Sequence, residues 1–316
     1  MRLRVAIVGA GSMGSMHARV VSESSLCELA AVIDPRVDAA KSVADRYGGR
    51  VLAEFEPAGL DAVVVAAATP AHYELALQVI ASGLPLLVEK PLADSLDQVR
   101  GILEASEVAG VPLMCGLLER YNPAVLTAMR IVREPAHVTS TRHSPYAPRV
   151  RTGVASDLLI HDLDLTLRIF GQEPEAVRGA FSHPHPGSAP GAEDVAEAVM
   201  TFPGGGIATL SASRIGQRKI RSLSIGEVGQ LIDIDLLRRD VTIYRHVANE
   251  ATPDGVGYRQ QTVIEIPTLV TGQEPLAAQL DRFIGLVEGS VDVDAERANI
   301  LPAHRVLERV RETACY

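Results

Sequence analysis

A glycine-rich hexapeptide near the amino terminus, Gly9-Ala10-Gly11-Ser12-Met13-Gly14, restricts this chain to a small number of folds. It follows the apolar run 3–8 and precedes residues 15–24, where apolar side chains recur at helical spacing. A second apolar run, 29–33, ends at Asp34. A strand, a glycine loop, a helix and a second strand ending in an acid are together the parts of a dinucleotide-binding βαβ unit.

The three glycines of this loop have separate physical roles. Gly9 allows a tight turn, Gly11 lets the backbone approach a pyrophosphate, and Gly14 lets the helix pack closely on the strand. The N–H groups that open the helix, at Ser12 and Met13, are expected to bind the pyrophosphate at the positive end of the helix dipole. The loop therefore predicts a dinucleotide cofactor.

Two residues after the second apolar run bear on the choice of cofactor. Asp34 is expected to accept hydrogen bonds from the adenosine ribose hydroxyls and to repel a 2′-phosphate, which favours NAD. Arg36 offers a charge that a 2′-phosphate would pair with instead, so NADP stays open at this point.

The chain divides into two parts with different patterns. Through residue 118, strands at 62–67, 84–88 and 111–115 alternate with helices at 39–47, 72–81 and 95–108, the last capped by Asp94. This alternation predicts a doubly wound parallel α/β sheet and a dinucleotide-binding domain at 1–118.

Residues 119–316 are expected to form a second, α+β domain. Successive strands without intervening helices predict a mostly antiparallel sheet. They are expected at 136–142, 177–182, 192–202, 207–213, 221–225, 230–234 and 241–245, with helices at 124–132, 157–170, 275–288 and 295–313.

Composition excludes several classes of function. A net charge of −9, no tryptophan and 4% aromatic residues argue against a nucleic-acid partner. The longest charge-free apolar stretch, 62–71, is too short for a membrane helix. The scattered Cys27, Cys115 and Cys315 suggest neither a disulfide framework nor a zinc site, and they suit a reducing cytoplasm. The segment His183-Pro184-His185 is interpreted as a surface loop, so no metal is expected.

Two groups of residues can carry chemistry. Lys90 directly follows a buried strand and precedes a proline, so its backbone is held at the edge of the sheet where ligands bind. In the helix 157–170, Asp157, His161, Asp164 and Arg168 fall on one polar stripe. Asp157 and His161 are one turn apart, so the carboxylate can orient an imidazole that exchanges protons near neutral pH.

The glycine loop, Glu89-Lys90-Pro91 and the Asp157/His161 pair within residues 156–162 together resemble the glucose–fructose oxidoreductase, inositol dehydrogenase and MocA family. The resemblance implies a Rossmann domain followed by a domain with a large open sheet that is often used for oligomerisation. It therefore implies a homodimer or homotetramer.

The resemblance also implies roles for individual residues. Lys90 and His161 become the catalytic dyad, with His161 favoured as the base, and Asp157 contacts the substrate or orients His161. The cofactor site would include Thr69, Pro70, His72, Glu89 and Lys90, with the first three beside the nicotinamide. Residues 119–124 and 161–164 resemble a subgroup that oxidises C3 of UDP-N-acetylglucosamine-type nucleotide sugars, which places Arg120 and Asn122 near cofactor or sugar.

These observations predict an NAD(P)-dependent oxidoreductase that transfers a hydride between nicotinamide and a secondary alcohol or ketone of a sugar or nucleotide sugar. The alternatives are an inositol or free-sugar dehydrogenase, a non-catalytic dinucleotide-binding regulator, and a reductase of an unsaturated ring or imine. Lys90, Asp157 and His161 are all present, which argues against the last two.

Overall fold

The computed structural model describes residues 2–148, 150–251 and 258–315. The chain forms two compact units. The first extends to Leu118 and includes Glu274–Arg305, and the second comprises Glu119–Gln273 and the chain from Val306 onward. The sequence-based division assigned all of 119–316 to the second domain, whereas the structure packs the segment 274–305 with the first unit.

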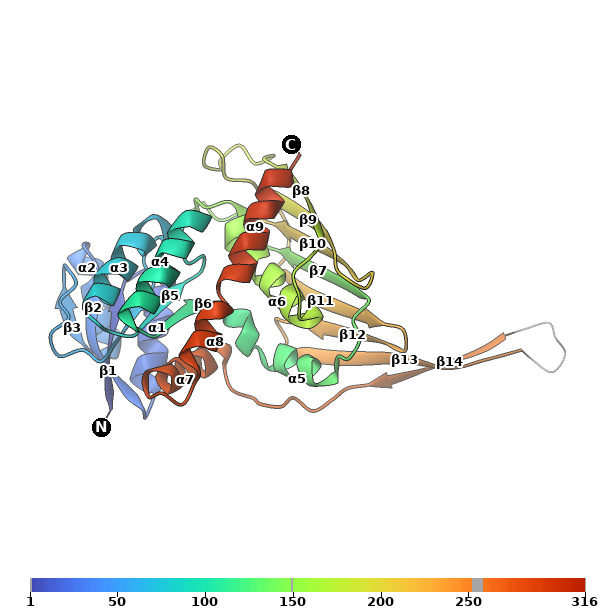
Figure 1. The fold of residues 1–316 in the computed structure, drawn as a ribbon, viewed down its shortest axis with the longest axis horizontal. Coiled ribbons are helices and arrows are strands. Elements are labelled where there is room, and N and C mark those ends of the chain that lie inside the picture. The colour runs from blue at the N-terminus through green and yellow to red at the C-terminus, as the bar shows by residue number, and fades with distance from the viewer. Residues whose placement is uncertain (1, 149, 252–257, 316) are drawn as a thin grey trace. The chain divides into compact units, whose positions relative to one another are not determined.

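The first unit is built on a parallel sheet, which confirms the predicted sheet type, and its six strands lie in the order β3-β2-β1-β4-β5-β6 (Figure 1). From β1 the chain adds strands first toward one edge of the sheet, as β2 and β3, and then toward the other edge, as β4, β5 and β6. Ligands bind at such a switch point, between β1 and β4, outside the carboxyl ends of the strands. The short strand β3 was not predicted from the sequence. The strands are β1 (Leu3–Val8), β2 (Cys27–Ile33), β3 (Arg50–Leu52), β4 (Ala62–Val65), β5 (Leu86–Glu89) and β6 (Leu113–Gly116).

Helices cover both faces of this sheet, which is why β4 is apolar and buried along its whole length. The N-cap of α4 is Ser95, whose hydroxyl accepts a hydrogen bond from the Gln98 N–H at 3.3 Å, and not Asp94 as predicted. The helices of the first unit are α1 (Ser12–Glu23), α2 (Val37–Tyr47), the 3₁₀ turn η1 (Thr69–Ala71), α3 (His72–Ala81), α4 (Leu96–Ala109), α7 (Pro275–Val287) and α8 (Val293–Ala298).

The second unit is built on an eight-stranded sheet of order β14-β13-β12-β11-β7-β10-β9-β8. Every neighbouring pair is antiparallel except β10 with β7, so the prediction of a mostly antiparallel sheet is confirmed. The strand β14, which completes a long hairpin with β13, was not predicted. The strands are β7 (His137–His143), β8 (Ala176–Ser182), β9 (Val195–Thr201), β10 (Ile207–Ser213), β11 (Ile220–Glu227), β12 (Gln230–Asp235), β13 (Asp240–Ala251) and β14 (Tyr258–Glu265).

The helices of the second unit, α5 (Pro123–Ile131), α6 (Ile160–Phe170) and the later turns of α9 (Leu301–Thr313), lie on one face of this sheet (Figure 1). Strand β7 shows the consequence, because Val138, Ser140 and Arg142 point to the helices and are buried. Two helices predicted as continuous are interrupted. A π-helical segment, Ala155–Leu159, precedes α6, and the expected helix 295–313 is divided into α8 and α9.

Candidate active site

The glycine loop of the first unit has two positions where only glycine fits. Gly9 has φ +102°, and a Cβ there would lie 2.5 Å from the backbone nitrogen of Ala67. A Cβ at Gly14 would lie 1.8 Å from the carbonyl oxygen of Gly9. Gly9 makes the turn at the end of β1, and Gly14 lets α1 pack on that turn.

Gly11 has a different environment. A Cβ at this position would meet no atom within 4 Å, and Gly11 is the N-cap of α1 with no side-chain cap. The N–H groups in the first turn of an α-helix have no intrahelical acceptors. In α1 these groups include the N–H groups of Ser12 and Met13. The open backbone beside these donors fits the pyrophosphate of a dinucleotide.

Asp34 lies directly after β2 with its carboxylate held by the loop. Its Oδ2 accepts from the Ala10 N–H at 2.8 Å, and its Oδ1 accepts from the Arg36 N–H at 2.9 Å and from Arg36 Nε at 3.3 Å. Burial acts to raise the pKa of Asp34, but these hydrogen bonds and the Arg36 charge outweigh it, and the pKa is lowered. The carboxylate is therefore ionised where the ribose is expected, and the exposed Arg36 side chain is folded back onto it.

The loop after β4 carries the residues expected beside the nicotinamide. Thr69 is partly exposed and Pro70 is exposed, so both are accessible. The ring of His72 is buried instead, with Nδ1 2.9 Å from the Pro91 carbonyl oxygen and Nε2 3.0 Å from that of Ala67. Both ring nitrogens are thus engaged with the backbone, and His72 fixes two strand ends to each other.

Lys90 follows β5 and is held through its neighbour Glu89. Glu89 Oε2 accepts from the Lys90 N–H at 3.1 Å, while Oε1 lies 2.8 Å from Nε2 of the buried His17. Burial acts to raise the pKa of Glu89, but the bond and charge of His17 and the charge of Lys90 outweigh it, and the pKa is lowered. Glu89 therefore supports the lysine segment from within the unit.

Sequence reasoning missed two histidines that contact this segment. His17 occupies the buried face of α1, and His304 in α9 accepts from the Leu92 N–H at 3.0 Å. A polar residue among the apolar positions of α1 was a signal for His17. The sequence held no such signal for His304, because its partner is more than two hundred residues away.

In the second unit, Asp157 and His161 are positioned by the π segment and α6. Glu193 Oε1 accepts from the Ala155 N–H at 2.7 Å, and the Asp157 N–H donates to the Gly153 carbonyl at 3.0 Å. Both predicted side chains are half-buried. π-helical turns occur often at functional sites, because the extra residue redirects the side chains around it.

Two buried ion-pair groups tie α6 to its surroundings. Arg142 of β7 donates to both carboxylate oxygens of Asp162, at 2.8 and 2.9 Å, and to Glu119 at 2.7 Å. The carboxylates outweigh the desolvation of Arg142 and raise its pKa. Arg120 donates to both oxygens of Asp164, at 2.8 and 2.6 Å.

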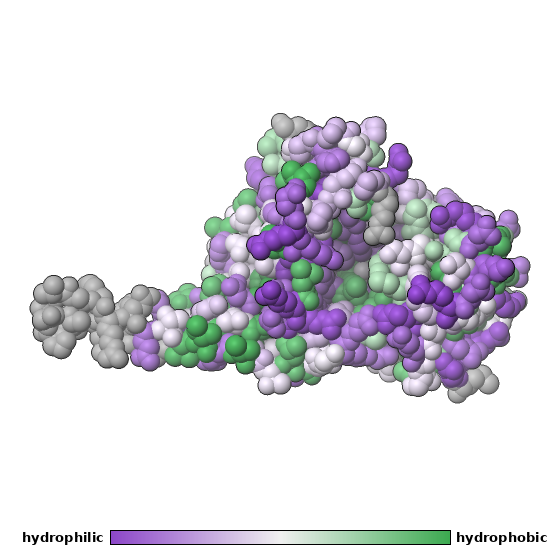
Figure 2. Space-filling model, turned by 180° about the vertical axis from the view of Figure 1, so that it is seen from behind, coloured by the Kyte–Doolittle hydropathy of each residue, from purple (hydrophilic) through white to green (hydrophobic). Residues whose placement is uncertain are grey.

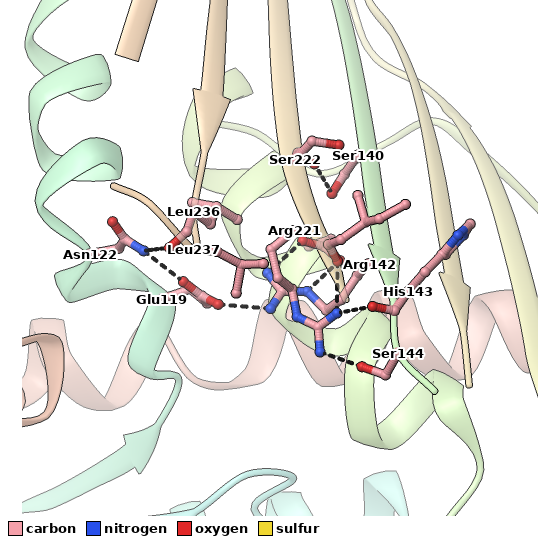
Figure 3. A network of polar contacts seen from close by, with 12 residues as sticks. Glu119, Asn122, Ser140, Arg142, His143, Ser144, Arg221, Ser222, Leu236 and Leu237 are labelled. Carbon is pink, nitrogen blue, oxygen red and sulfur yellow. Dashed lines mark hydrogen bonds and ion pairs between the residues drawn. The ribbon is translucent and has the colours of Figure 1, made fainter. Parts of the chain in front are cut away.

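These contacts change the interpretation of the predicted polar stripe. Asp164 is buried and paired, while Arg168 is exposed, so the stripe is not one solvated face. Asn122 caps α5 by accepting from the Ala124 N–H at 3.1 Å, and its amide donates to the Leu236 carbonyl at 3.0 Å (Figure 3). The contacts described for Arg120 and Asn122 thus lie within the second unit, and their predicted contact with substrate stays a prediction.

The predicted site residues fall into two sets, one in each unit. The first unit brings its set to the carboxyl ends of β1, β2, β4 and β5, namely Gly9, Gly11, Ser12, Met13, Gly14, Asp34, Arg36, Thr69, Pro70, His72, Glu89 and Lys90. The second unit carries Asp157 in the π-helical segment and His161 in the first turn of α6, together with Arg120 and Asn122 just before α5.

Other features concern metals and membranes. No group of three or more histidine, cysteine or acidic side chains within residues 2–148, 150–251 and 258–315 could hold a metal ion. The His185 ring stacks on Tyr146, with ring centroids 3.5 Å apart, and its Nδ1 accepts from the Gly187 N–H at 3.1 Å.

None of the helices in the described ranges is long and apolar enough to span a membrane.

Comparisons with known proteins cover most of the chain. A UDP-N-acetylglucosamine 3-dehydrogenase of Acidithiobacillus ferrooxidans is 27% identical over 289 residues, which is 90% of this chain and 88% of that protein. A scyllo-inositol 2-dehydrogenase (NAD(+)) of Bacillus subtilis is 26% identical over 336 residues, 98% of each. A solved structure of the A. ferrooxidans enzyme has a TM-score of 0.85 and 26% identity, covering 99% of this chain and 98% of that one.

Family models match in both units. Residues 3–117 match the model of an oxidoreductase family with an NAD-binding Rossmann fold, and residues 129–231 match the C-terminal domain of the same family. The chain therefore belongs to the GFO/IDH/MocA family of NAD-binding oxidoreductases.

Proposed function

We propose that the protein is an NAD-dependent dehydrogenase that oxidises a secondary hydroxyl group of a nucleotide sugar of the UDP-N-acetylglucosamine type, at C3. The observation that carries this proposal is the similarity to the A. ferrooxidans dehydrogenase, which extends over 90% of the chain. An inositol is the second candidate substrate, because the B. subtilis enzyme matches 98% of the chain at nearly the same identity.

The proposed mechanism divides the chemistry between the two units. When bound, NAD supplies the acceptor for the hydride that leaves the sugar carbon. His161 takes the proton of the reacting hydroxyl, Lys90 donates a hydrogen bond to the same oxygen, and Asp157 orients His161. The C–H and O–H bonds break and a C=O bond forms, so one hydride and one proton leave the substrate.

The first unit contributes mainly position. Gly11 and the N–H groups at the start of α1 would hold the pyrophosphate, and Asp34 would hold the ribose hydroxyls. His72 and Glu89 would fix the loops on which Thr69 and Lys90 lie. Correct placement of the two reacting groups supplies much of the rate enhancement of such an enzyme.

We also propose that the protein works as a homodimer or homotetramer. One row of residues crosses the sheet on the face opposite Arg142, and three of its members, Ile207, Leu231 and Ile264, are 44%, 39% and 61% exposed. In spatial order this row is Ile207, His137, Gly226, Leu231, Tyr244 and Ile264. Figure 2 shows apolar surface beside the β13–β14 hairpin. Apolar side chains in such a row support association between copies, and light scattering after size exclusion tests it.

We place the protein in a reducing compartment, the cytoplasm. Cys27 and Cys115 are buried in the first unit and form no disulfide with each other or with Cys315. Buried thiols of this kind suit a compartment that keeps cysteines reduced.

The test is an assay of the purified protein with NAD while absorbance at 340 nm is followed. UDP-N-acetylglucosamine, myo-inositol, scyllo-inositol and glucose are compared as substrates. We expect turnover of the nucleotide sugar, and we expect Lys90→Met to lower kcat by about 100-fold or more with NAD binding retained. Lys41→Met, at an exposed lysine of α2, is the matched control and is expected to leave kcat unchanged.

The possible outcomes separate the hypotheses. Turnover of an inositol but not of the nucleotide sugar would replace the first candidate with the second. Full activity of Lys90→Met would overturn the role of Lys90. Binding of NAD without turnover of any substrate would overturn the proposal and favour a non-catalytic regulator.

A further inference from the structure

Two arginines face each other across the sheet of the second unit. Arg142 of β7 and Arg221 of β11 are direct partners in the antiparallel ladder, on the face covered by α6. Figure 3 shows the two guanidinium groups close together. Like charges directly opposite each other destabilise a strand pair unless other groups compensate them.

Only one of the two arginines has carboxylates as direct partners. Arg142 binds Asp162 and Glu119, as described above. Arg221 instead donates to three neutral acceptors, the carbonyl oxygens of His143 at 2.6 Å and Ile220 at 2.8 Å and the hydroxyl of Ser144 at 2.8 Å. Within the described residues, no carboxylate lies within ion-pair distance of Arg221.

The electrostatic state of Arg221 agrees with these contacts. Burial, and after it the charge of Arg142, lower the pKa of Arg221 to about 10, against the attraction of Asp162, Glu119 and Asp157, which acts to raise it. Even so, Arg221 keeps its charge at neutral pH. A partly buried cation that contacts only neutral acceptors is a costly arrangement, and such groups gather at functional sites.

The geometry of Arg221 leaves donors for a ligand. A guanidinium has five N–H groups, and the three hydrogen bonds above use two on Nη1 and one on Nη2. In the described part of the chain, Nε–H and the second Nη2–H make no hydrogen bond. These two parallel donors form the fork that binds a phosphate in bidentate fashion.

A second arginine without a carboxylate lies close by. Arg214 follows β10 and is buried, and it donates to the backbone carbonyls of Val150 and Thr152. Its strand end is joined to the β7 end, because the Ser144 N–H donates to the Ser213 carbonyl at 2.8 Å. The start of β11 and the end of β10 therefore carry two arginines, Arg221 and Arg214, whose hydrogen bonds within the described residues all go to neutral oxygen atoms.

This position is near the proposed reaction centre without being part of it. Arg142, the strand partner of Arg221, binds Asp162, which directly follows His161 in α6. Asp157 is also close enough for its charge to act on Arg221. An anion at Arg221 would thus belong to a substituent of the substrate and not to the hydroxyl that reacts.

We propose that Arg221 binds the diphosphate group of a nucleotide-linked substrate and selects it over neutral sugars and inositols. The inference rests on the proposed function, because it names the part of the substrate that the second unit recognises. A diphosphate suits the site better than a single carboxylate, since it carries two negative groups and the strand ends carry Arg221 and Arg214.

The test uses the NAD-loaded protein and the variants Arg221→Gln and Arg221→Lys. For Arg221→Gln we expect KM for UDP-N-acetylglucosamine and the dissociation constant of UDP to rise about 10- to 100-fold, as for loss of one charged hydrogen-bonded contact. We expect kcat to stay within about threefold of the wild-type value, and KM for NAD to stay unchanged. Arg221→Lys keeps the charge without the fork and is expected to give an intermediate effect.

Three controls make the result specific. Arg238→Gln removes an arginine whose side chain is 79% exposed in the same unit, and it is expected to leave all constants unchanged. N-acetylglucosamine, which lacks the diphosphate, and galacturonate, which offers a carboxylate instead, are compared by calorimetry with UDP. Thermal melting reports whether each variant folds. If Arg221→Gln does not fold, the kinetics and UDP binding of Arg221→Lys test the inference instead.

Each outcome has a separate meaning. Suppose that Arg221→Gln oxidises UDP-N-acetylglucosamine with an unchanged KM and an unchanged affinity for UDP. This result would overturn the inference and leave the proposed function standing. If only Arg221→Lys folds, the same result in that variant has the same meaning. UDP binding that the substitution weakens, in a protein that oxidises no sugar, would support the inference while the proposed function fails. Wild-type binding of galacturonate but not UDP, or no binding of either, would overturn the inference.

Discussion

Nε2 of His17 lies 2.8 Å from Oε1 of Glu89, and both side chains are buried. His17 is on α1, whose amino-terminal end carries the glycine loop, and Glu89 is the residue before Lys90. The contact therefore joins the helix expected to bind the pyrophosphate to the segment that carries the proposed catalytic lysine. His72 and His304 contact Pro91 and Leu92 of the same segment.

Removal of His17 is expected to weaken both stability and catalysis. His17→Ala leaves a buried carboxylate without its ring partner, which costs about 3–5 kcal/mol of unfolding free energy. We also expect kcat to fall by more than KM changes, because Glu89 no longer fixes Lys90. Urea unfolding and steady-state kinetics measure the two effects. His17→Gln retains a donor and is expected to recover part of kcat, and the coupling would be refuted if both variants had wild-type kcat.

Acid stability is expected to depend on Glu89. Its pKa is lowered in the folded state, so in the range below the unfolded value of about 4.3 the unfolded chain binds more protons. The stability from the ionised carboxylate is therefore present above that value and is lost as pH falls through the folded pKa. Denaturant unfolding between about pH 3 and pH 6 should show a shallower dependence for Glu89→Gln than for wild type. Equal slopes would contradict the assignment.

The cofactor preference is expected to depend on Asp34. Asp34→Ser removes a charge that repels a 2′-phosphate and releases Arg36 from its contact with that carboxylate. We expect the ratio of kcat/KM for NADP to that for NAD to rise about tenfold or more. Adding Arg36→Gln to this variant should reverse most of the gain, and an unchanged ratio in Asp34→Ser would show that the ribose lies elsewhere.

The glycine loop offers a matched pair of substitutions. Gly11→Ala adds a methyl group where no atom lies within 4 Å, so we expect it to fold and melt as wild type while NAD affinity falls. Gly14→Ala places the methyl 1.8 Å from a backbone oxygen, so we expect little folded protein. Melting curves with and without NAD distinguish the two, and a Gly11→Ala variant with unchanged NAD affinity would contradict the placement of the pyrophosphate.

Local patterns predicted much of the fold because their causes are local. Buried parallel strands such as β4 are continuously apolar, and the glycine loop needs its backbone conformation in any context. Features set by distant partners were not predictable. Asp164 was assigned to a polar stripe because its partner Arg120 is 44 residues away in the chain. The interruption of the helix after Ala298, by contrast, had a local signal that the prediction of one helix over 295–313 overlooked, because Pro302 has no N–H to donate to the carbonyl of Ala298.

The candidate site shows the same division. The sequence and its resemblance to a family singled out Lys90, Asp157 and His161, whose roles remain to be tested by substitution. His72 was expected beside the cofactor, but its ring contacts two backbone carbonyls, which only the packing of α3 against the strand ends determines. Arg221 lay within a predicted strand, and its contacts depend on the pairing of β11 with β7.

The packing of residues 274–305 with the first unit has a consequence for biosynthesis. The glycine loop and the parallel strands leave the ribosome early, but α7, which packs against α1, and His304, which contacts Leu92, follow only after the whole large sheet has been translated. Leu280, Phe283 and Ile284 of α7 are buried in the finished protein, so their apolar contacts are missing until then. The core of the dinucleotide-binding unit therefore stays incomplete during translation until the large sheet of the second unit has been synthesised.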